Sequence, residues 1–394
     1  FCQDGVNEDS MSEMHEYISE HLITNKEKER ARHELQTQFK KKIIDKFKVQ
    51  INLTNKREKN NSLEIPTLGE KKAVVYDSLL KDHPRLLIDG VWGLAQIEFD
   101  SVDREIKMTQ FKPFQLSDIS LEDFIEARKE FTTEEWMNAL ISTIGMDYNN
   151  YDYRRKLILI SRLIPMVEKN VFMMEFGLPG TGKTYAYEQI SSYSRVISGS
   201  KVTEAQLFYN LNTNQEGLLC QYDSVMFDEI DKVKGTGIDV GVINKLYQYL
   251  ASGKFDRGGV EKHSHCGVVM VGNMPNGEVN MNTLLGNLLH ETMVRDAFLD
   301  RLAGVIPGWE LDPIKNREQS LTKHYGFTAD YFSEILNQLR DLNTNSYINS
   351  RINLPGAGIR DQDAINRNFS GLIKLIYPHM DIPEDEFKKI GRAS

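Results

Sequence analysis

Residues 177–184 read GLPGTGKT and follow directly on the apolar run VFMMEF. Gly177, Gly182, Lys183 and Thr184 match the G-x-x-x-x-G-K-[ST] pattern of a phosphate-binding loop. In such a loop the glycines let backbone N–H groups wrap a phosphate, the lysine reaches the terminal phosphates, and the hydroxyl can hold Mg²⁺. A Gly-Pro turn with a surface lysine is the alternative. A strand candidate before the loop and a helix candidate after it favour the nucleotide site, so we predict ATP and Mg²⁺ as cofactors.

A second, acidic motif lies in SVMFDEI, where Asp228 and Glu229 end another apolar run. We expect Asp228 to hold Mg²⁺ through water and Glu229 to polarise the attacking water, a pair that separates hydrolysing enzymes from kinases. An acidic strand end that caps a helix is the alternative. Gly180 and Tyr185, within and just after the loop, complete the predicted nucleotide-binding set.

A third apolar run, VVMVGN, ends in Asn273. A polar side chain there suits a place between the two motifs, where it would align water near the γ-phosphate. Alternatively, Asn273 only turns the chain before the Met-Pro-Asn-Gly that follows. Strand and phosphate loop, strand and Asp-Glu, then strand and Asn predict an AAA+ ATPase core of α/β class.

Two arginines complete this prediction. Arg301 in FLDRL follows a helical stretch, where ring ATPases carry a finger that enters a neighbour's site, and Arg295 is a nearby competitor. Arg360 in GAGIRDQDAINR opens a helix of the expected lid, where a sensor arginine would touch the γ-phosphate. The alternatives are local pairing of Arg301 with Asp300 or Asp296, and an ordinary surface position for Arg360.

Hydrophobic periodicity divides the chain into three predicted parts. These are an N-terminal domain at 1–150 (helical 1–40, β-rich 42–112, helical 117–147), the α/β core at 151–315, and a helical lid at 316–394. The β-rich part suggests a small barrel, which we expect to be similar to an OB-fold. Alternating strand and helix candidates in the core predict a parallel sheet.

The chain has 394 residues and a formal net charge of −9, which argues against a uniformly basic nucleic-acid binder but not against a local basic patch. Its three cysteines lie far apart and suit a reducing cytosol, so we expect a cytoplasmic protein. No apolar stretch approaches the length needed to cross a membrane.

Local basic patches are nevertheless present. From residue 26 to 48 nine basic residues face four acidic ones, a local charge of 9 − 4 = +5. A second cluster reads NKREKNN, and GKFDRGGVEKHSH suits a basic hairpin. The DNA-binding candidates are Lys40, Lys41, Lys42, Lys46, Lys48, Lys56, Arg57, Lys254, Arg257 and Lys262. A solvated charged face and an exposed loop are the respective alternatives.

Several stretches together resemble one family: RRKLILISRLIPMVEKN, EFGLPGTGKT, MFDEI, YLASGKFDRG, VGNMPN, FLDRLAGVIPGWE and HYGFTADYFSEILNQLR. They are similar to the BrxL-type, Lon-like ATPases of bacterial BREX phage-defence systems. The resemblance implies an AAA+ core similar to Lon and MCM helicases, hexamer-based rings (single or stacked), and an N-terminal domain that binds double-stranded DNA. It also implies other BREX defence proteins as candidate partners. Walker, sensor and finger roles carry over onto Lys183, Thr184, Asp228, Glu229, Asn273, Arg301 and Arg360.

The sequence departs from that family in one respect. Members continue into a Lon-protease-like domain with a Ser/Lys arrangement, whereas this sequence stops where that domain should begin and offers no candidate dyad. We expect a fragment or a short variant that is not itself a protease. Three hypotheses stay open: a ring that encircles or moves along DNA, a protein-remodelling ATPase that serves a protease domain absent from this chain, and a static ATP-dependent scaffold on DNA.

Overall fold

The computed structural model describes residues 16–24, 26–51, 61–87, 90–114, 119–197, 202–211, 215–230, 240–274, 296–352 and 354–391. The chain forms two compact units, Phe1–Asp118 and Ile119–Ser394, and each is described by itself below. Among the helices that the described ranges contain, none combines the length and the apolar character needed to cross a bilayer.

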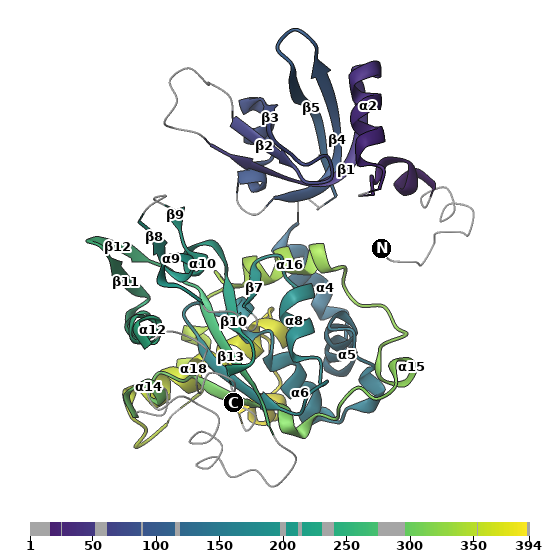
Figure 1. The fold of residues 1–394 in the computed structure, drawn as a ribbon. Helices are drawn as coiled ribbons and strands as arrows, with labels where there is room; N and C mark the ends of the chain where they lie inside the picture. Colours follow the sequence, from purple (N-terminus) through teal and green to yellow (C-terminus); the bar gives the residue numbers. More distant parts are fainter. Residues whose placement is uncertain are drawn as a thin grey trace. The chain divides into compact units, whose positions relative to one another are not determined.

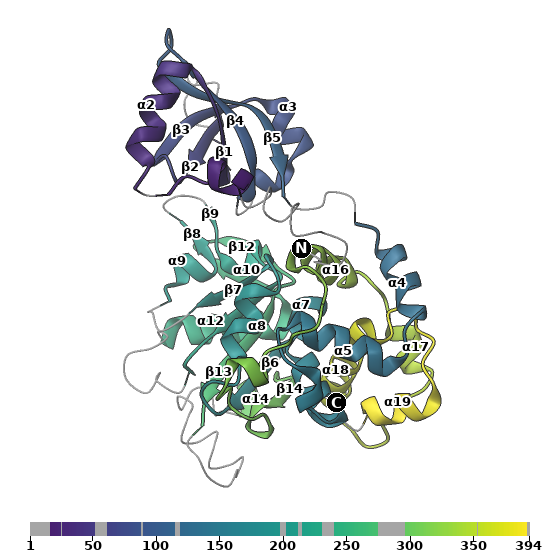
Figure 2. The same cartoon turned by 90° about the vertical axis from the view of Figure 1, so that its right-hand side faces the viewer.

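The first unit is a closed barrel with helices beside it (Figure 2). Its elements are α2 (Lys28–Gln38), β1 (Lys40–Gln50), β2 (Asn61–Ile65), β3 (Glu70–Val75), α3 (Asp77–Asp82), a 3₁₀ turn (Pro84–Leu87), β4 (Val91–Asp100) and β5 (Glu105–Pro113). The strands close in the order β1-β2-β3-β5-β4, in which β3 and β5 run parallel and the other pairs antiparallel. The β-rich prediction for residues 42–112 therefore corresponds to a barrel.

Alternation along the strands fills the barrel. Odd-numbered residues of β1 such as Ile43 and Phe47 point inward and are fully buried, as strand geometry requires. Asp45 is also inward, and its carboxylate accepts hydrogen bonds from the backbone N–H (2.8 Å) and the hydroxyl of Thr67. At Gly93 a Cβ would lie 2.5 Å from the ring of Phe111, so a larger residue would force the packed ring to move.

The second unit is built on a parallel sheet (Figure 1). Its strands are β6 (Phe172–Gly177), β7 (Ser194–Ile197), β10 (Ser224–Phe227), β13 (Gly267–Asn273) and β14 (Gly304–Pro307), in the order β14-β6-β13-β10-β7. Both faces are covered, which explains why the strands read as continuous apolar runs. Phe172, Met174 and Phe176 enter one apolar cluster, while Met173 enters the other.

Helices cover both faces. One face carries α9 (Glu204–Leu207), α10 (Leu218–Gln221), α12 (Val240–Ser252) and α14 (Asp296–Leu299). The other carries α4 (Leu121–Lys129), α5 (Thr133–Thr143), α6 (Tyr153–Ser161), α7 (Ile164–Val167), α8 (Lys183–Gln189), α16 (Ala329–Leu339), α17 (Asn345–Asn349), α18 (Ile359–Ile376) and α19 (Glu384–Gly391). Short elements complete the unit: 3₁₀ turns at Tyr148–Asn150 and Gly308–Glu310, α15 (Arg317–Ser320), and the hairpins β8 (Tyr209–Asn210) with β9 (Gln215–Glu216) and β11 (Lys254–Arg257) with β12 (Val260–His263).

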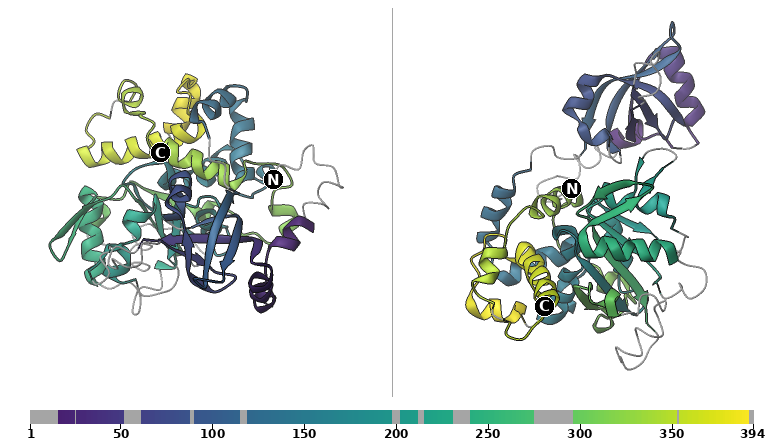
Figure 3. Two further views of the ribbon diagram at one scale, coloured as in Figure 1. Left: turned by 90° about the horizontal axis from the view of Figure 1, so that it is seen from above. Right: turned by 90° about the vertical axis from the view of Figure 1, so that its left-hand side faces the viewer.

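The unit boundary differs from the predicted one. We assigned residues 117–147 to the N-terminal domain, but α4 and α5 belong to the second unit. The indole N–H of Trp136 donates to the Leu375 carbonyl at 2.9 Å, and the Arg128 guanidinium donates to the Ile376 carbonyl at 2.7 Å. These bonds and the apolar face of α5 fasten both helices to α18. The right-hand panel of Figure 3 shows the yellow C-terminal helices against the helices that precede β6.

Candidate nucleotide-binding site

The predicted phosphate loop lies between β6 and α8, and each of its glycines has a structural reason. Gly180 and Gly182 have φ of +81° and +76°, a region that residues with a Cβ rarely adopt. A Cβ at Gly177 would lie 2.7 Å from the backbone of Gly308, so only glycine allows this approach. The loop conformation is therefore fixed by residue type.

Lys183 is buried and bends back over the loop. Its Nζ donates to the carbonyl oxygens of Gly177 (3.1 Å) and Leu178 (2.7 Å) and to Oδ1 of Asn273 (3.2 Å). These three acceptors are neutral. A phosphate oxygen would offer a stronger, charge-assisted hydrogen bond at the same ammonium group.

The acidic motif lies next to the loop. The Thr184 hydroxyl donates to Oδ2 of Asp228 at 2.7 Å, which links the start of α8 to the end of β10. Because β13 lies between β6 and β10, its last residue, Asn273, is placed between the two motifs. A hydroxyl and a carboxylate are oxygen ligands of the kind that Mg²⁺ prefers, and Mg²⁺ sites use few protein ligands, so these residues fit the ion.

Glu229 has an unusual backbone. Its φ is +58°, in the left-handed region, and its N–H donates to Oδ1 of Asp228 at 2.8 Å. A non-glycine residue held there carries strain, and such strain gathers at functional sites. The surrounding fold therefore holds the Glu229 backbone in a conformation that it would not adopt by itself.

A buried ion pair beneath the loop was not predicted from the sequence. Arg162 and Glu175 are each 0% exposed, and Nη2 of the arginine lies 2.7 Å from Oε1 of the glutamate. The arginine also donates from Nη1 to the carbonyl of Thr181, inside the loop, at 3.0 Å. The sequence does contain an indication of this pair, because each of the two apolar runs LILISRLIPMV and VFMMEF includes one charged residue.

Two further segments lie against the loop. The Ile314 N–H donates to the Gly180 carbonyl at 2.9 Å, and a Cβ at Gly182 would lie 2.4 Å from the Met146 methyl group. Tyr185 is exposed at the start of α8, with its ring 3.5 Å from the position of a Cβ at Gly145. Residues 145–146 and 314 were not predicted as neighbours of the loop.

The two predicted arginines lie together at the N-terminal end of the strands, opposite the end that carries the phosphate loop. The loop follows the C-terminal end of β6, whereas Arg301 precedes the N-terminal end of the parallel strand β14. The Arg301 guanidinium lies over the ring of Tyr247 at 3.9 Å, and Arg360 pairs with Asp300 at 2.6 Å. Both arginines line a pocket of about 160 Å³ with Arg367. Arg360 thus lies away from the phosphate loop of its own chain, and its contact with a γ-phosphate stays a prediction.

The basic candidates have acidic neighbours. On the barrel, Lys41 pairs with Glu34 at 2.6 Å and Lys40 with Glu98 at 3.4 Å. Lys42 is exposed, and Lys46 and Lys48 are half-buried on the outer face. Lys56 and Arg57 lie outside the described residues.

The predicted basic hairpin is confirmed as β11 and β12, but its role in DNA binding stays a prediction. Its basic side chains pair with carboxylates: Lys254 with Glu261 (3.4 Å), Arg257 with Glu204 (3.5 Å) and Lys262 with Glu216 (2.9 Å). These pairs offset much of the positive charge that the sequence suggested.

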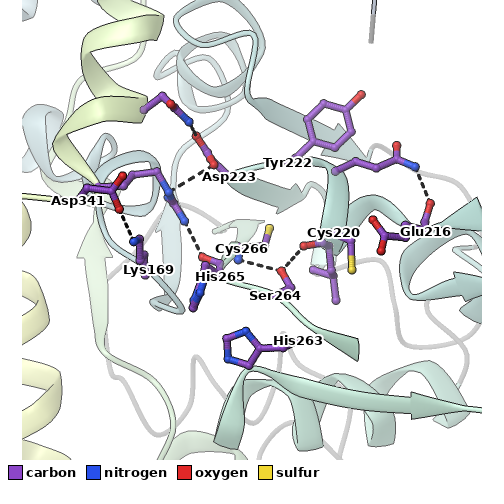
Figure 4. A pocket seen from close by; sticks show the side chains of 14 residues that line it. Lys169, Glu216, Cys220, Tyr222, Asp223, His263, Ser264, His265, Cys266 and Asp341 are labelled. Atoms are coloured by element: carbon purple, nitrogen blue, oxygen red, sulfur yellow. Dashed lines mark hydrogen bonds and ion pairs between the residues drawn. The ribbon is translucent and has the colours of Figure 1, made fainter. Parts of the chain in front are cut away.

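A second polar pocket, of about 370 Å³, lies where this hairpin meets the end of α16 (Figure 4). Arg340 pairs there with Asp223 at 3.3 Å, and the Asn337 amide donates to the same carboxylate at 2.7 Å. Burial raises the pKa of Asp223, and raises the pKa of the Cys220 thiol to about 11. The thiol is therefore protonated at neutral pH. None of the predicted site residues lines this pocket, whose charges join α16 to the sheet.

Comparison with known proteins covers both units. Residues 106–394 match the family described as "Lon-like protease BrxL-like, ATPase domain". Residues 2–99 match the family described as "BREX system Lon protease-like protein BrxL N-terminal". The first match alone spans the whole second unit and the end of the barrel.

Two relatives named as BrxL agree with these family matches. The chain is 32% identical over 396 residues to a Lon-like protease BrxL of Bacillus cereus (strain H3081.97), covering 98% of this chain and 57% of that protein. It is 31% identical over 384 residues to a Lon-like protease BrxL of Escherichia coli O9:H4 (strain HS), covering 95% of this chain and 54% of that protein. The chain thus spans about half the length of these relatives. A full-length MCM homolog from Methanopyrus kandleri aligns with a TM-score of 0.46 and 9% identity, covering 90% of this chain and 76% of that one.

Proposed function

This chain belongs to the BrxL family of Lon-like proteins, and we propose that it is an AAA+ ATPase that hydrolyses ATP with Mg²⁺. The single observation that carries the proposal is the meeting of Lys183, Asn273, Thr184 and Asp228 at the C-terminal edge of the sheet. The strand order β14-β6-β13-β10-β7 supports the AAA+ assignment, because it places the third motif between the first two.

Each side chain then has a chemical task. The Lys183 ammonium exchanges its neutral acceptors for the terminal phosphates of ATP. The Asn273 amide orients water near the γ-phosphate, and the Glu229 carboxylate accepts a proton from that water. Mg²⁺ held by Thr184 and Asp228 would offset the charge of the phosphate oxygens.

We propose that Tyr185 lies beside the bound nucleotide, because it is exposed next to the loop. The apolar side chains of Met146 and Ile314, which lie next to Gly182, support a place for the adenine base on the same side of the loop as Tyr185.

Arg301 and Arg360 are proposed to act on a neighbouring subunit. Both lie at the edge of the sheet away from their own phosphate loop, so they can meet a nucleotide only in another copy. A trans-acting arginine stabilises the charge of the transition state and makes hydrolysis depend on assembly. This supports a homo-oligomeric ring, which the family resemblance implies is a hexamer or stacked hexamers.

The ring is proposed to bind double-stranded DNA and to serve BREX phage defence with other proteins of that system. Support comes from the barrel, whose strand order matches that of the oligonucleotide-binding OB-fold, and from the lysines on its outer face. The family description names the BREX system.

A protein-remodelling ATPase is the second candidate. It is favoured by the description of both relatives as Lon-like proteases and by the half of their length that this chain does not cover. DNA dependence separates the two functions: stimulation of hydrolysis by duplex DNA supports the first, and stimulation by an unfolded protein alone supports the second.

The test is phosphate release by the purified chain with ATP and Mg²⁺, with and without duplex DNA. Lys183→Ala should abolish turnover, while Lys129→Ala, at an exposed surface pair with Glu126, should not change it. Turnover that survives Lys183→Ala would contradict the proposal.

A further inference from the structure

A tyrosine of α12 lies against the Arg301 guanidinium. The guanidinium carbon lies over the Tyr247 ring, 3.9 Å from the ring centre, which is close to the separation of carbon atoms in van der Waals contact. A cation over an aromatic ring is attracted by the negative face of the ring. Leu250 and Ala251 follow three and four residues later on the same face of α12, and they line the pocket of about 160 Å³ described above, here called the arginine pocket.

The backbone next to Arg301 is fixed by the packing of α14. Phe298 is buried, and its ring makes an edge contact with the ring of Phe172 on β6, with the ring centres 5.3 Å apart. The Arg301 N–H donates to the Phe298 carbonyl at 3.2 Å. An arginine side chain has several rotatable bonds, so a fixed backbone alone does not fix the direction of the guanidinium. The Tyr247 ring supplies a contact at the charged end of the side chain.

The arginines of the arginine pocket are held in different ways. Arg360 pairs with the Asp300 carboxylate at 2.6 Å, and Arg367 donates to a backbone carbonyl at 3.0 Å. Both contacts use N–H donors of the guanidinium. The contact of Arg301 with Tyr247 is different, because an aromatic ring attracts the positive charge as a whole and needs no donated hydrogen bond. Such a contact can restrain the side chain without competing with phosphate oxygens for the same donors.

We propose that Tyr247 is a positioning residue for Arg301, whose guanidinium it directs toward the nucleotide of the neighbouring subunit. The inference rests on the proposed action of Arg301 in trans and deepens it by naming the side chain that prepares the arginine. Charge that is already oriented stabilises a transition state without the cost of reorganisation. Tyr247 lies with Arg301 at the end of the strands away from its own phosphate loop, so it contributes to the rate of hydrolysis and not to the binding of ATP.

The experiment measures steady-state ATP hydrolysis by the assembled full chain. Tyr247→Leu removes the ring but keeps an apolar side chain at this position, which packs partly against an apolar cluster. We expect kcat to fall by about two- to thirtyfold, the usual range for losing a cation–π contact, with KM for ATP unchanged. Tyr247→Phe keeps the ring and should hydrolyse ATP at nearly the parental rate. Arg301→Ala should be slower by about a thousandfold or more.

A second close stack in the same unit provides the matched control. The Arg351 guanidinium lies over the Tyr347 ring at 3.8 Å, and Tyr347 also packs partly against an apolar cluster, but its helix α17 does not line the arginine pocket. Tyr347→Leu should therefore leave kcat unchanged. Thermal unfolding of both variants separates a loss of rate from a loss of folding. Tyr247→Met, with a longer apolar side chain, takes the place of Tyr247→Leu if the latter unfolds early.

Mixed assemblies show whether Tyr247 acts on the neighbouring site. Lys183→Ala subunits keep Tyr247 and Arg301 but have a defective phosphate loop. Mixing them with Tyr247→Leu subunits should raise hydrolysis per Tyr247→Leu subunit, because an intact loop then faces an intact arginine. Mixing Tyr247→Leu with Arg301→Ala subunits should give no rise, since both changes are on the same side of the interface.

The results distinguish the role of Tyr247 from that of Arg301. Normal kcat in Tyr247→Leu, with Arg301→Ala slow, overturns the role of Tyr247 and leaves the trans arginine standing. A loss in Tyr247→Phe as large as in Tyr247→Leu overturns it too, because the effect then belongs to the hydroxyl group. Absence of a rise on mixing with Lys183→Ala also overturns it, because Tyr247 then acts within its own chain. Normal hydrolysis in Arg301→Ala overturns both roles.

Discussion

The ion pair between Arg162 and Glu175 leads to a quantitative prediction. Glu175→Gln keeps the shape of the side chain but leaves the Arg162 guanidinium at a position with 0% exposure and no opposite charge in contact. Removing one partner of a buried pair costs about 3–5 kcal/mol of the free energy of unfolding, because the remaining charge is desolvated without compensation. The second unit has 394 − 118 = 276 residues. For a domain of roughly this size, each kcal/mol lowers the melting temperature by about 2–4 °C, so we expect a decrease of about 6–20 °C.

The chain offers a matched control. Arg154 and Glu310 form a similar two-pronged pair, with both hydrogen bonds at 2.7 Å, but at the surface. Glu310→Gln should cost at most about 1 kcal/mol, since exposed pairs contribute little. Both variants are compared by thermal unfolding of the same chain. A double variant, Arg162→Met with Glu175→Leu, removes both charges and should recover most of the lost stability.

The pair should also affect nucleotide binding, since Arg162 holds the Thr181 carbonyl of the phosphate loop. At a temperature where all proteins are folded, the double variant should bind ATP more weakly than Glu310→Gln does. Two results would contradict this role of the pair: Glu175→Gln melting within about 2 °C of the parent chain, or a double variant that is folded, stable and normal in ATP affinity.

Further predictions concern the proposed catalytic groups and the barrel. Lys183→Ala should lose most ATP affinity or turnover with an unchanged fold, as measured by nucleotide titration and circular dichroism. Glu229→Gln should still bind ATP but hydrolyse it at least about a hundredfold more slowly, since general-base catalysis contributes about that much; normal turnover would exclude the role. Mixing Arg301→Ala with Lys183→Ala subunits should restore some hydrolysis at mixed interfaces, and no recovery in verified mixed assemblies would count against action in trans. Duplex affinity should fall about a hundredfold or more between about 50 and 200 mM salt, and Lys42→Glu with Lys46→Glu should flatten that slope; a slope that the reversals leave unchanged would show a solvated face only.

Local patterns predicted much of the arrangement seen at the candidate nucleotide-binding site. The glycines, Lys183 and Thr184 lie where the loop pattern requires, because that pattern encodes backbone angles and contacts within a few residues. The strand ends at Asp228 and Asn273 also follow from short apolar runs with a polar end.

Contacts between distant segments could not be predicted in the same way. Trp136 and Leu375 are 239 residues apart, and the apolar periodicity of α5 does not specify its partner helix. For the same reason the helical pattern around Arg360 did not indicate that the start of α18 would lie beside Asp300. Charged residues inside apolar runs, such as Arg162 and Glu175, indicate that a buried ion pair exists, but they do not show which residues pair with each other.

The hydrogen bond from Trp136 to Leu375 has a consequence for synthesis in the cell. Its two residues are separated by 239 positions, which a ribosome adding about 5–20 residues per second needs roughly 12–50 s to traverse. Throughout that interval α18, one of the helices that cover the apolar face of α5, has not yet been made. We therefore expect early N-terminal intermediates to expose Trp136, Leu140 and Ile141, and to be the stage at which chaperones bind the nascent chain.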